Sequence, residues 1–199
     1  MTIEKFRTLF AESIAVKQRL LTGDHLAPLA VMGERIAQAV QRGNKVMLCG
    51  NGGSAADAQH LAAELLIRLR PDRNRKPVPA LALAQDTSTL TACGNDFGYD
   101  QIFSRVLSAI GKPGDILLGI STSGNSVNVI NAFKVARASQ IATFAFLGGN
   151  GGELLPFSDE AFLVPSSDTG RIQEAHITAG HALMEDVEDR LLAAGYLVV

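Results

Sequence analysis

The sequence has 199 residues, of which 47% are hydrophobic and 19% charged, and its formal net charge is −2. The composition excludes a disordered or fibrous chain, and the length suits one domain with a substantial core, so we expect a single domain over residues 1–199. The small net charge gives no general attraction to nucleic acid or to an anionic membrane, which favours a small, specific ligand.

Two features of the sequence indicate the cellular compartment of the protein. The only cysteines, Cys49 and Cys93, are too few and too isolated for a disulfide framework or a Cys-based zinc site. The first residues lack the apolar core of a signal peptide, and no run approaches the roughly 18 apolar residues of a membrane span. We therefore expect a cytoplasmic protein without a membrane segment.

Apolar residues at helical spacing predict two helices, over residues 2–21 and 29–40, within an N-terminal helical segment 1–43. The apolar run at 45–50 then predicts a strand that leads into a glycine-rich loop and a helix over 55–69. This order of strand, loop and helix recurs along the α/β core, residues 44–199.

The later elements follow the same pattern. The further predicted strands are 80–83, 115–120, 141–147 and 161–164, and the further helices are 99–110, 127–137 and 169–194. Apolar strands that alternate with helices predict a three-layer α/β sandwich, with a five-stranded parallel sheet covered by helices on both faces. Ligands of such sheets bind beyond the carboxyl ends of the strands, where both polar loops of this chain lie.

The first loop is Gly50-Asn51-Gly52-Gly53-Ser54. Its glycines tolerate unusual backbone angles, and the helix that follows offers free N–H groups to an anion. Phosphate binding and tight packing both remain open here, because glycine-rich turns after buried strands serve either purpose. The spacing fits neither a nucleotide P-loop nor a dinucleotide fingerprint, so nucleotide binding is disfavoured.

The second loop, residues 121–126, places four hydroxyls within six residues at a helix start. One hydroxyl would suffice to cap the helix. The surplus favours phosphate recognition over an ordinary capped turn. These hydroxyls belong to Ser121, Thr122, Ser123 and Ser126.

Two helices carry candidate acid-base and metal-binding groups. His60 and Glu64 lie four residues apart, about 6 Å in rise, on one face of a predicted helix, as a metal pair or a surface pair would. The last helix carries Gln173, His176 and His181 among apolar residues, and these could be core groups or ligands. Of the two histidines, His181 is the better candidate, although it lies about 12 Å along the helix from Gln173.

Two further polar stretches are less specific. Residues 68–76 contain Arg70 and Arg75 in a basic stretch that Pro71 and Asp72 interrupt and Pro77 ends, which is typical of a solvated loop. Asn95 and Asp96 lie in a turn-prone segment, where they could bond their own backbone or hold sugar hydroxyls.

Together these segments resemble the sugar isomerase (SIS) domain family, and within it the isomerases of phosphorylated heptoses. The resemblance runs through nearly the whole chain. It is carried by residues 49–60, Glu64, the segments 94–99, 119–126 and 171–176, and His181.

The resemblance implies a flavodoxin/Rossmann-like SIS fold and conversion of D-sedoheptulose 7-phosphate to D-glycero-D-manno-heptose 7-phosphate through an enediol, the first step of nucleotide-activated heptose biosynthesis. It implies Glu64 and His181 as the acid-base pair, and a homotetramer with active sites at subunit contacts, in which the two N-terminal helices pack. It implies one Zn²⁺ per subunit, held by His60, Glu64, Gln173 and His181. The implied substrate contacts are Asn51, Gly52, Gly53, Ser54, Glu64, Asn95, Asp96, Ser121, Thr122, Ser123, Ser126 and Gln173.

One departure concerns Gly170, which stands where some relatives carry an Asp before the Arg, and which turns attention to Asp168. Two other functions were weighed. A non-catalytic SIS protein that binds the replication initiator would lack part of the acid-base set, which this chain carries in full. A sugar-phosphate-sensing regulator would be expected to carry a DNA-binding domain, for which the 199 residues leave no segment.

Overall fold

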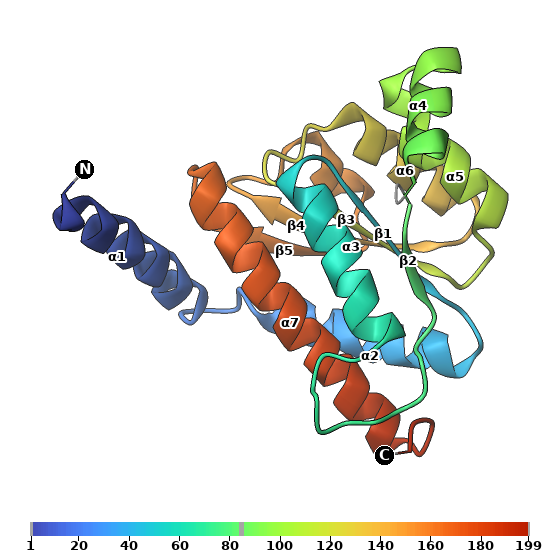
Figure 1. Cartoon of the computed structure of the whole chain (residues 1–199), viewed down its shortest axis with the longest axis horizontal. Coiled ribbons are helices and arrows are strands. Elements are labelled where there is room, and N and C mark those ends of the chain that lie inside the picture. The colour runs from blue at the N-terminus through green and yellow to red at the C-terminus, as the bar shows by residue number, and fades with distance from the viewer. Residues whose placement is uncertain (1, 84–85, 199) are drawn as a thin grey trace.

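The computed structural model describes residues 2–83 and 86–198 and contains one five-stranded sheet (Figure 1). All neighbouring strands pair in parallel, in the order β2-β1-β3-β4-β5. The strands are β1 (Val46–Gly50), β2 (Ala80–Ala82), β3 (Ile116–Ser121), β4 (Ala142–Gly148) and β5 (Glu160–Val164). The predicted α/β fold is confirmed, and the strand order reverses between β1 and β3, where ligands of such sheets bind.

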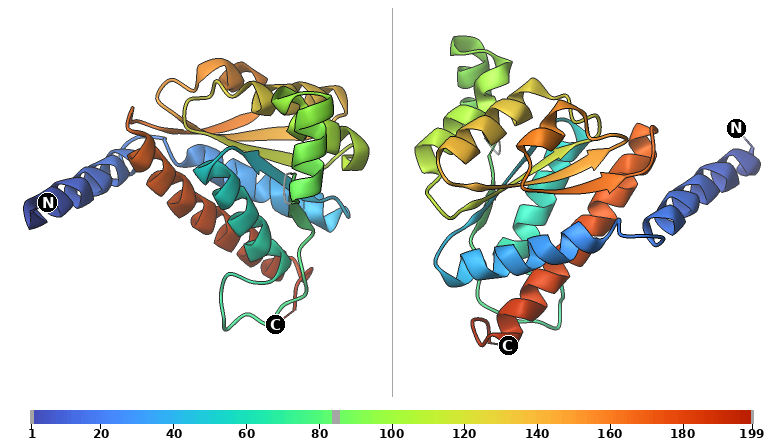
Figure 2. Two further views of the ribbon diagram at one scale, coloured as in Figure 1. Left: turned by 45° about the horizontal axis from the view of Figure 1, so that its top comes forward. Right: turned by 180° about the vertical axis from the view of Figure 1, so that it is seen from behind.

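Helices cover both faces of the sheet, with α2, α3 and α7 on one side and α5 and α6 on the other (Figure 2). The helices are α1 (Ile3–Leu20), α2 (Ala27–Gln41), α3 (Gly53–Leu66), α4 (Thr87–Asp96), α5 (Ile102–Ile110), α6 (Val127–Ala138) and α7 (Thr169–Ala193), with short 3-10 helices η1 (Tyr99–Gln101) and η2 (Gly152–Phe157). Within the described ranges, no helix is both long enough and apolar enough to cross a membrane.

The strands are mostly apolar because most of their residues are buried on both faces of the sheet. In β1, Leu48 packs into a core cluster with residues of α2, α3 and α7, whereas the adjacent Met47 packs into a second cluster with residues of α5 and α6. Successive side chains of a strand point to opposite faces, so each strand contributes to both clusters.

The segment before η1 corrects the sequence-based prediction, which has no helix there and puts Asn95 and Asp96 in a turn. The structure places both residues on the last turn of α4. The helix is rich in Thr and Ser, which have low helix propensity, and only Cys93 of its residues is buried. It begins where the Asp86 carboxylate accepts a hydrogen bond from the Thr89 N–H at 2.7 Å, an N-cap that stabilises a weak helix.

Helix α1 extends away from the rest of the chain (Figures 1 and 2). Only Val16 and Leu20 of this helix are buried, whereas Phe6 and Phe10 are exposed. Helix α2, in contrast, packs on α7 and β5 of its own chain and contributes Met32 to the core. The two N-terminal helices therefore differ, because α2 belongs to the core and most of α1 does not.

The basic stretch 68–76 is not a uniformly solvated loop, which corrects the prediction for two of its arginines. The Arg75 side chain is 1% exposed, and its Nε lies 2.5 Å from Glu188 Oε2 on α7. Arg70 Nε donates to the other oxygen of Glu188 at 2.7 Å. Arg75 also donates to the backbone carbonyl oxygens of Glu64 and Leu65, so it binds the end of α3 to α7.

A second group of buried polar residues, separate from Arg75 and Glu188, lies at the amino ends of β1 and β3. The Asp115 carboxylate is fully buried and accepts four hydrogen bonds. The donors are Lys45 Nζ at 2.5 Å, Lys45 N at 3.0 Å, Lys112 N at 2.9 Å and Asn44 Nδ2 at 3.2 Å. A buried carboxylate with this many donors is stabilised in its charged form.

Asp115 is therefore expected to make stability depend on pH in the acid range. Burial alone would raise the pKa of this carboxyl, but the hydrogen bonds outweigh burial and the pKa lies below its ordinary value of 3.8. The stabilisation is present above the unfolded-state pKa and is lost as pH falls through the lower folded-state pKa. We expect the free energy of unfolding to fall less steeply between about pH 5 and pH 2 in Asp115→Asn than in the wild type, as measured by denaturant titration.

The matched control is Asp72→Asn, because the Asp72 side chain is 76% exposed. This variant should retain the wild-type slope. If the free energy of unfolding of Asp115→Asn fell with pH as steeply as that of the wild type, Asp115 would not be the source of the loss of stability in acid.

Candidate active site

Close packing of α3 against α7 brings the candidate acid-base groups together. A Cβ atom at Gly180 would lie 2.6 Å from Leu61 Cδ1, so only glycine permits this separation of the two helices. His60 and Glu64 on α3 consequently face His181 on α7.

The three side chains form one cluster. His60 Nε2 lies 2.8 Å from His181 Nε2 and 3.3 Å from Glu64 Oε1. One possible ligand atom from each residue lies within 4.8 Å of the other two. The Glu64 side chain is 15% exposed and that of His60 is 48% exposed, so the cluster is open to a ligand on one side.

Asp57 adds a carboxylate beside this cluster, which the sequence analysis did not single out. It precedes His60 by one turn of α3, and its Oδ2 is buried without a hydrogen-bond partner. Burial raises the pKa of the Asp57 carboxyl, and the charges of His60 and His181 oppose that rise. A buried, unpaired carboxylate oxygen next to two histidines favours a positive charge in this region.

The polar residues of α7 separate into two groups. His176 is fully buried, its Nε2 lies 3.1 Å from the Leu147 carbonyl oxygen, and burial lowers its pKa to about 4. It is a core residue beside Phe146 and Phe162, in agreement with the preference for His181. Gln173 lies at the first loop instead, because a Cβ at Gly53 would be 2.6 Å from Gln173 Nε2.

The first loop follows β1 directly at the point where the strand order reverses. Gly52 has a φ of 56° and stands as the N-cap of α3, a conformation that suits glycine. Helix α3 begins at Gly53, two residues before its predicted start, so the loop and the helix N-terminus coincide. The Ser54 side chain lies in the first turn of α3 and is buried.

The second loop, between β3 and α6, uses its hydroxyls to organise itself. Ser121 Oγ accepts from the Gly124 N–H at 3.1 Å and lies 3.1 Å from Ser126 Oγ. Ser123 Oγ accepts from the Asn125 N–H at 3.2 Å. Ser126 is the N-cap residue of α6, but its side chain makes no capping bond, so ordinary helix capping does not account for this loop.

Beside this loop is a pocket of about 220 Å³, and the sequence analysis identified only some of the polar residues that line it. Thr122 and Ser123 line it from the second loop. The segment after β5 adds Ser166, Ser167 and Thr169. These hydroxyls come directly after the carboxyl end of β5, as the second loop comes after β3. Because ligands of parallel sheets bind at the carboxyl ends of strands, the sequence could have identified these residues as candidates.

Three polar residues from the sequence analysis have partners close to them in the chain. Asn95 Nδ2 donates to Asp96 Oδ1 at 2.7 Å, and both residues are exposed at the end of α4. Asp168 Oδ1 accepts from the Arg171 N–H at 3.0 Å and caps α7, so this oxygen is committed to the helix start.

Comparison with known proteins gives one family and many close relatives. The sequence model of the SIS domain matches residues 9–148. A phosphoheptose isomerase of Chlorobaculum parvum is 54% identical over 164 residues, which cover 82% of this chain and 78% of the relative. A phosphoheptose isomerase of Paramagnetospirillum magneticum is 48% identical over 195 residues, with 92% and 96% covered.

Solved structures of phosphoheptose isomerases have the same fold as this chain. The phosphoheptose isomerase of Neisseria gonorrhoeae superposes with a TM-score of 0.86 at 41% identity, over 94% of this chain and 98% of that chain. The phosphoheptose isomerase of Francisella tularensis gives a TM-score of 0.89 at 35% identity, over 95% and 100%.

Proposed function

The chain belongs to the SIS domain family, and on this premise we propose that it is a phosphoheptose isomerase that converts sedoheptulose 7-phosphate to D-glycero-D-manno-heptose 7-phosphate. It is a sugar-phosphate isomerase, as its high-coverage relatives are. The observation that carries the assignment is the contact of His60 and Glu64 on α3 with His181 on α7. A non-catalytic initiator-binding role is not favoured.

The residues of the cluster fit a bound Zn²⁺. Two imidazole nitrogens and a carboxylate oxygen are typical zinc ligands, and here they converge within one chain. The unpaired Asp57 oxygen supplies further negative potential beside them. We propose His60, Glu64 and His181 as ligands of one Zn²⁺ per subunit, which when bound would act as a Lewis acid on the sugar oxygens. Gln173 is proposed as the fourth ligand, and its side chain would have to turn from Gly53 toward the cluster to bind the ion.

Glu64 and His181 are proposed to move the protons. The Glu64 carboxylate takes a proton from C1 of the ketose, and the electron pair forms the double bond of an enediol. His181 transfers a proton between the two sugar oxygens, and return of a proton to C2 gives the aldose. Glu64 has two carboxylate oxygens, so one can bind a cation while the other accepts the proton.

The two loops are proposed to bind the other end of the substrate. Hydroxyls of the second loop and the free N–H groups at the start of α6 would hold the phosphate. The remaining proposed contacts are Asn51, Gly52, Gly53, Ser54, Asn95, Asp96, Ser121, Thr122, Ser123, Ser126 and Gln173. A phosphate held at a fixed distance from Glu64 would orient C1 and C2 for proton transfer.

Removal of zinc is expected to stop the reaction. Turnover of sedoheptulose 7-phosphate should fall at least about a hundredfold after chelation, because polarisation of the carbonyl contributes several kcal/mol to such reactions. Addition of Zn²⁺ should restore turnover, and metal content measured by mass spectrometry should follow the rate.

Two outcomes would contradict these proposals separately. Full activity in protein shown to contain no metal would exclude the role of zinc. An absence of aldose product both with and without zinc would exclude the isomerase itself.

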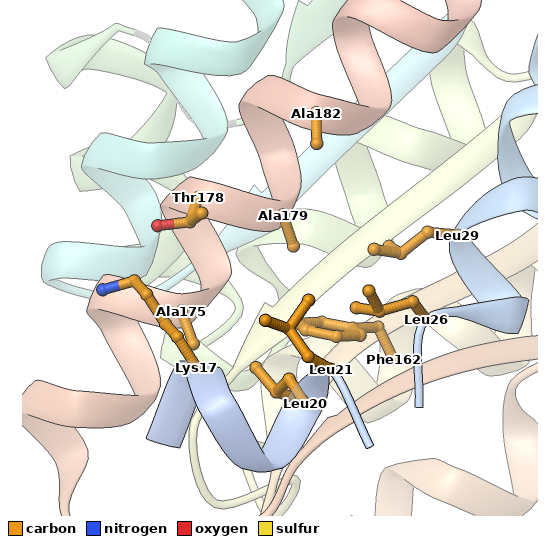
Figure 3. Close-up of a pocket in the computed structure, with 10 residues that line it drawn as sticks. All are labelled: Lys17, Leu20, Leu21, Leu26, Leu29, Phe162, Ala175, Thr178, Ala179 and Ala182. Carbon is orange, nitrogen blue, oxygen red and sulfur yellow. The ribbon is translucent and has the colours of Figure 1, made fainter. Parts of the chain in front are cut away.

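We also propose a homotetramer with active sites at subunit contacts. The supporting observation is an apolar surface on α1, where Phe6 is 54% exposed and Phe10 is 71% exposed. An apolar pocket of about 310 Å³ lies between α1, α2, α7 and β5 (Figure 3). Its lining residues are Lys17, Leu20, Leu21, Leu26, Leu29, Phe162, Ala175, Thr178, Ala179 and Ala182. Contiguous apolar surface of this kind is typical of protein contacts, and packing of α1 in an oligomer would bury it.

We propose a single SIS domain over residues 1–199 and a cytoplasmic location. The burial of α2 in the same core as β1 and α7 supports a single domain. Cys49 and Cys93 are both free and buried, which suits a reducing compartment.

A further inference from the structure

Asn51 lies at the centre of a side-chain hydrogen-bond network. Its Oδ1 accepts from the Tyr99 hydroxyl at 2.9 Å and from Asn128 Nδ2 at 2.8 Å. Its Nδ2 donates to Asn128 Oδ1 at 2.9 Å. An amide oxygen has two lone pairs and an amide nitrogen has two hydrogens, so the Asn51 side chain keeps only one N–H for a ligand.

Each partner comes from a different segment of the proposed substrate site. Asn51 belongs to the loop after β1, and Asn128 lies in the first turn of α6, directly after the second loop. Tyr99 begins η1, three residues after Asp96. A further bond, from Asn131 Nδ2 to the Asp100 carbonyl oxygen at 3.1 Å, joins α6 to η1 independently.

The buried member of the network fixes the orientation of the others. Asn128 is 2% exposed, and its Oδ1 also accepts from the Val129 N–H at 2.9 Å. This backbone bond requires the Asn128 oxygen to face the helix start, which leaves its Nδ2 directed at Asn51 Oδ1. The oxygen of Asn51 is thereby placed to accept from the hydroxyl of Tyr99, a residue that is 59% exposed.

From this geometry we propose that Tyr99 and Asn128 are positioning residues for the isomerase. Acting through Asn51, they hold the loop 51–54, the segment 95–99 and the loop 121–126 in the arrangement that binds the sugar phosphate. This role rests on the proposed function. Neither residue needs to touch the substrate, because each acts on Asn51.

The first test is Tyr99→Phe, which removes one hydroxyl from a residue that is 59% exposed. The KM for sedoheptulose 7-phosphate should rise about three- to tenfold, the contribution of one neutral hydrogen bond, with kcat within about twofold of the wild type. The thermal unfolding temperature should not change. The matched control is Tyr196→Phe, because the Tyr196 ring packs under Lys76 Nζ at 3.8 Å, and all three quantities should stay at wild-type values.

A double-mutant cycle with Asn51→Ala tests whether Tyr99 acts through Asn51. In the Asn51→Ala background, Tyr99→Phe should change KM by less than about twofold, because the shared bond is already absent. An undiminished loss in that background would overturn the proposal, since it would mean that Tyr99 acts on the substrate directly. An unchanged KM in the single variant would overturn it as well.

Asn128→Leu removes the buried amide and should raise KM more than Tyr99→Phe does. Because Asn128 is buried, unfolding temperature is measured with the kinetics. Should this variant fail to fold, the exposed Tyr99 still decides the question.

Binding of inorganic phosphate, measured by calorimetry on the same four proteins of the cycle, separates this proposal from the proposed reaction. Weaker phosphate binding that shows the expected coupling, in a chain that forms no aldose, would contradict the reaction and support the positioning role. An active enzyme without coupling in either KM or phosphate affinity would contradict the positioning role alone.

Discussion

Glu64→Gln should reduce the isomerisation of sedoheptulose 7-phosphate by at least about a thousandfold, because general acid-base groups commonly contribute 10²- to 10⁴-fold. The amide has nearly the same shape as the carboxylate but cannot accept the proton from C1. Its oxygen can still face the cation site near His60 Nε2. Substrate affinity measured by calorimetry should therefore stay near the wild-type value. Zinc content is measured on the same protein, because Glu64 is also a proposed zinc ligand.

The matched control is Glu185→Gln, which changes an exposed carboxylate on α7 and should leave the rate unaltered. A Glu64→Gln enzyme with a near-normal rate would remove this residue from the chemistry. A variant that loses zinc together with activity would assign Glu64 to metal binding and leave the base unidentified.

Glu188→Gln should lower the free energy of unfolding by about 3–5 kcal/mol, which is the usual cost of leaving a buried charge without its partner. Glu188 is 2% exposed, and its carboxylate lies against the guanidinium groups of Arg75 and Arg70. Arg75 is itself 1% exposed, so the amide would leave a positive charge buried without a counter-ion. Denaturant titration measures the loss.

The interaction itself is tested by combining Glu188→Gln with Arg75→Met. The double variant should lose less stability than the sum of the single variants, because it no longer buries an uncompensated charge. Glu185→Gln again serves as control, on the same helix and in solvent, and should change stability by no more than about 0.5 kcal/mol. Strict additivity would show that the two side chains stabilise the chain independently.

The sequence predicts the strands and most helices because their apolar residues recur at regular intervals. Helix α7 is predicted at 169–194 and found at Thr169–Ala193, and β4 is predicted at 141–147 and found at Ala142–Gly148. Helix α4 does not follow from such a pattern. It buries only Cys93 and depends on the Asp86 N-cap. A prediction based on the spacing of apolar residues does not detect such a helix.

The sequence predicts which segments form the candidate site, but not which side chains contact one another there. Glycines and hydroxyls after β1 and β3 identify both loops, since parallel strands put their carboxyl ends at one edge. That His181 rather than His176 meets His60 depends on the rotation of α7 and on its close approach to α3 at Gly180. The burial of Arg75 depends on a partner more than a hundred residues away in sequence, which no local pattern contains.

The position of the Asp115 cluster has a consequence for the divergence of this fold. It fastens β1 and β3 at the ends opposite to the loops that follow them, so these two strands are anchored without help from the loop residues. Replacements of side chains that face out of these loops, such as those of Thr122 and Ser123, would therefore leave the pairing of β1 with β3 intact. Such a division lets selection change which sugar is recognised while the framework that carries the loops is inherited unchanged.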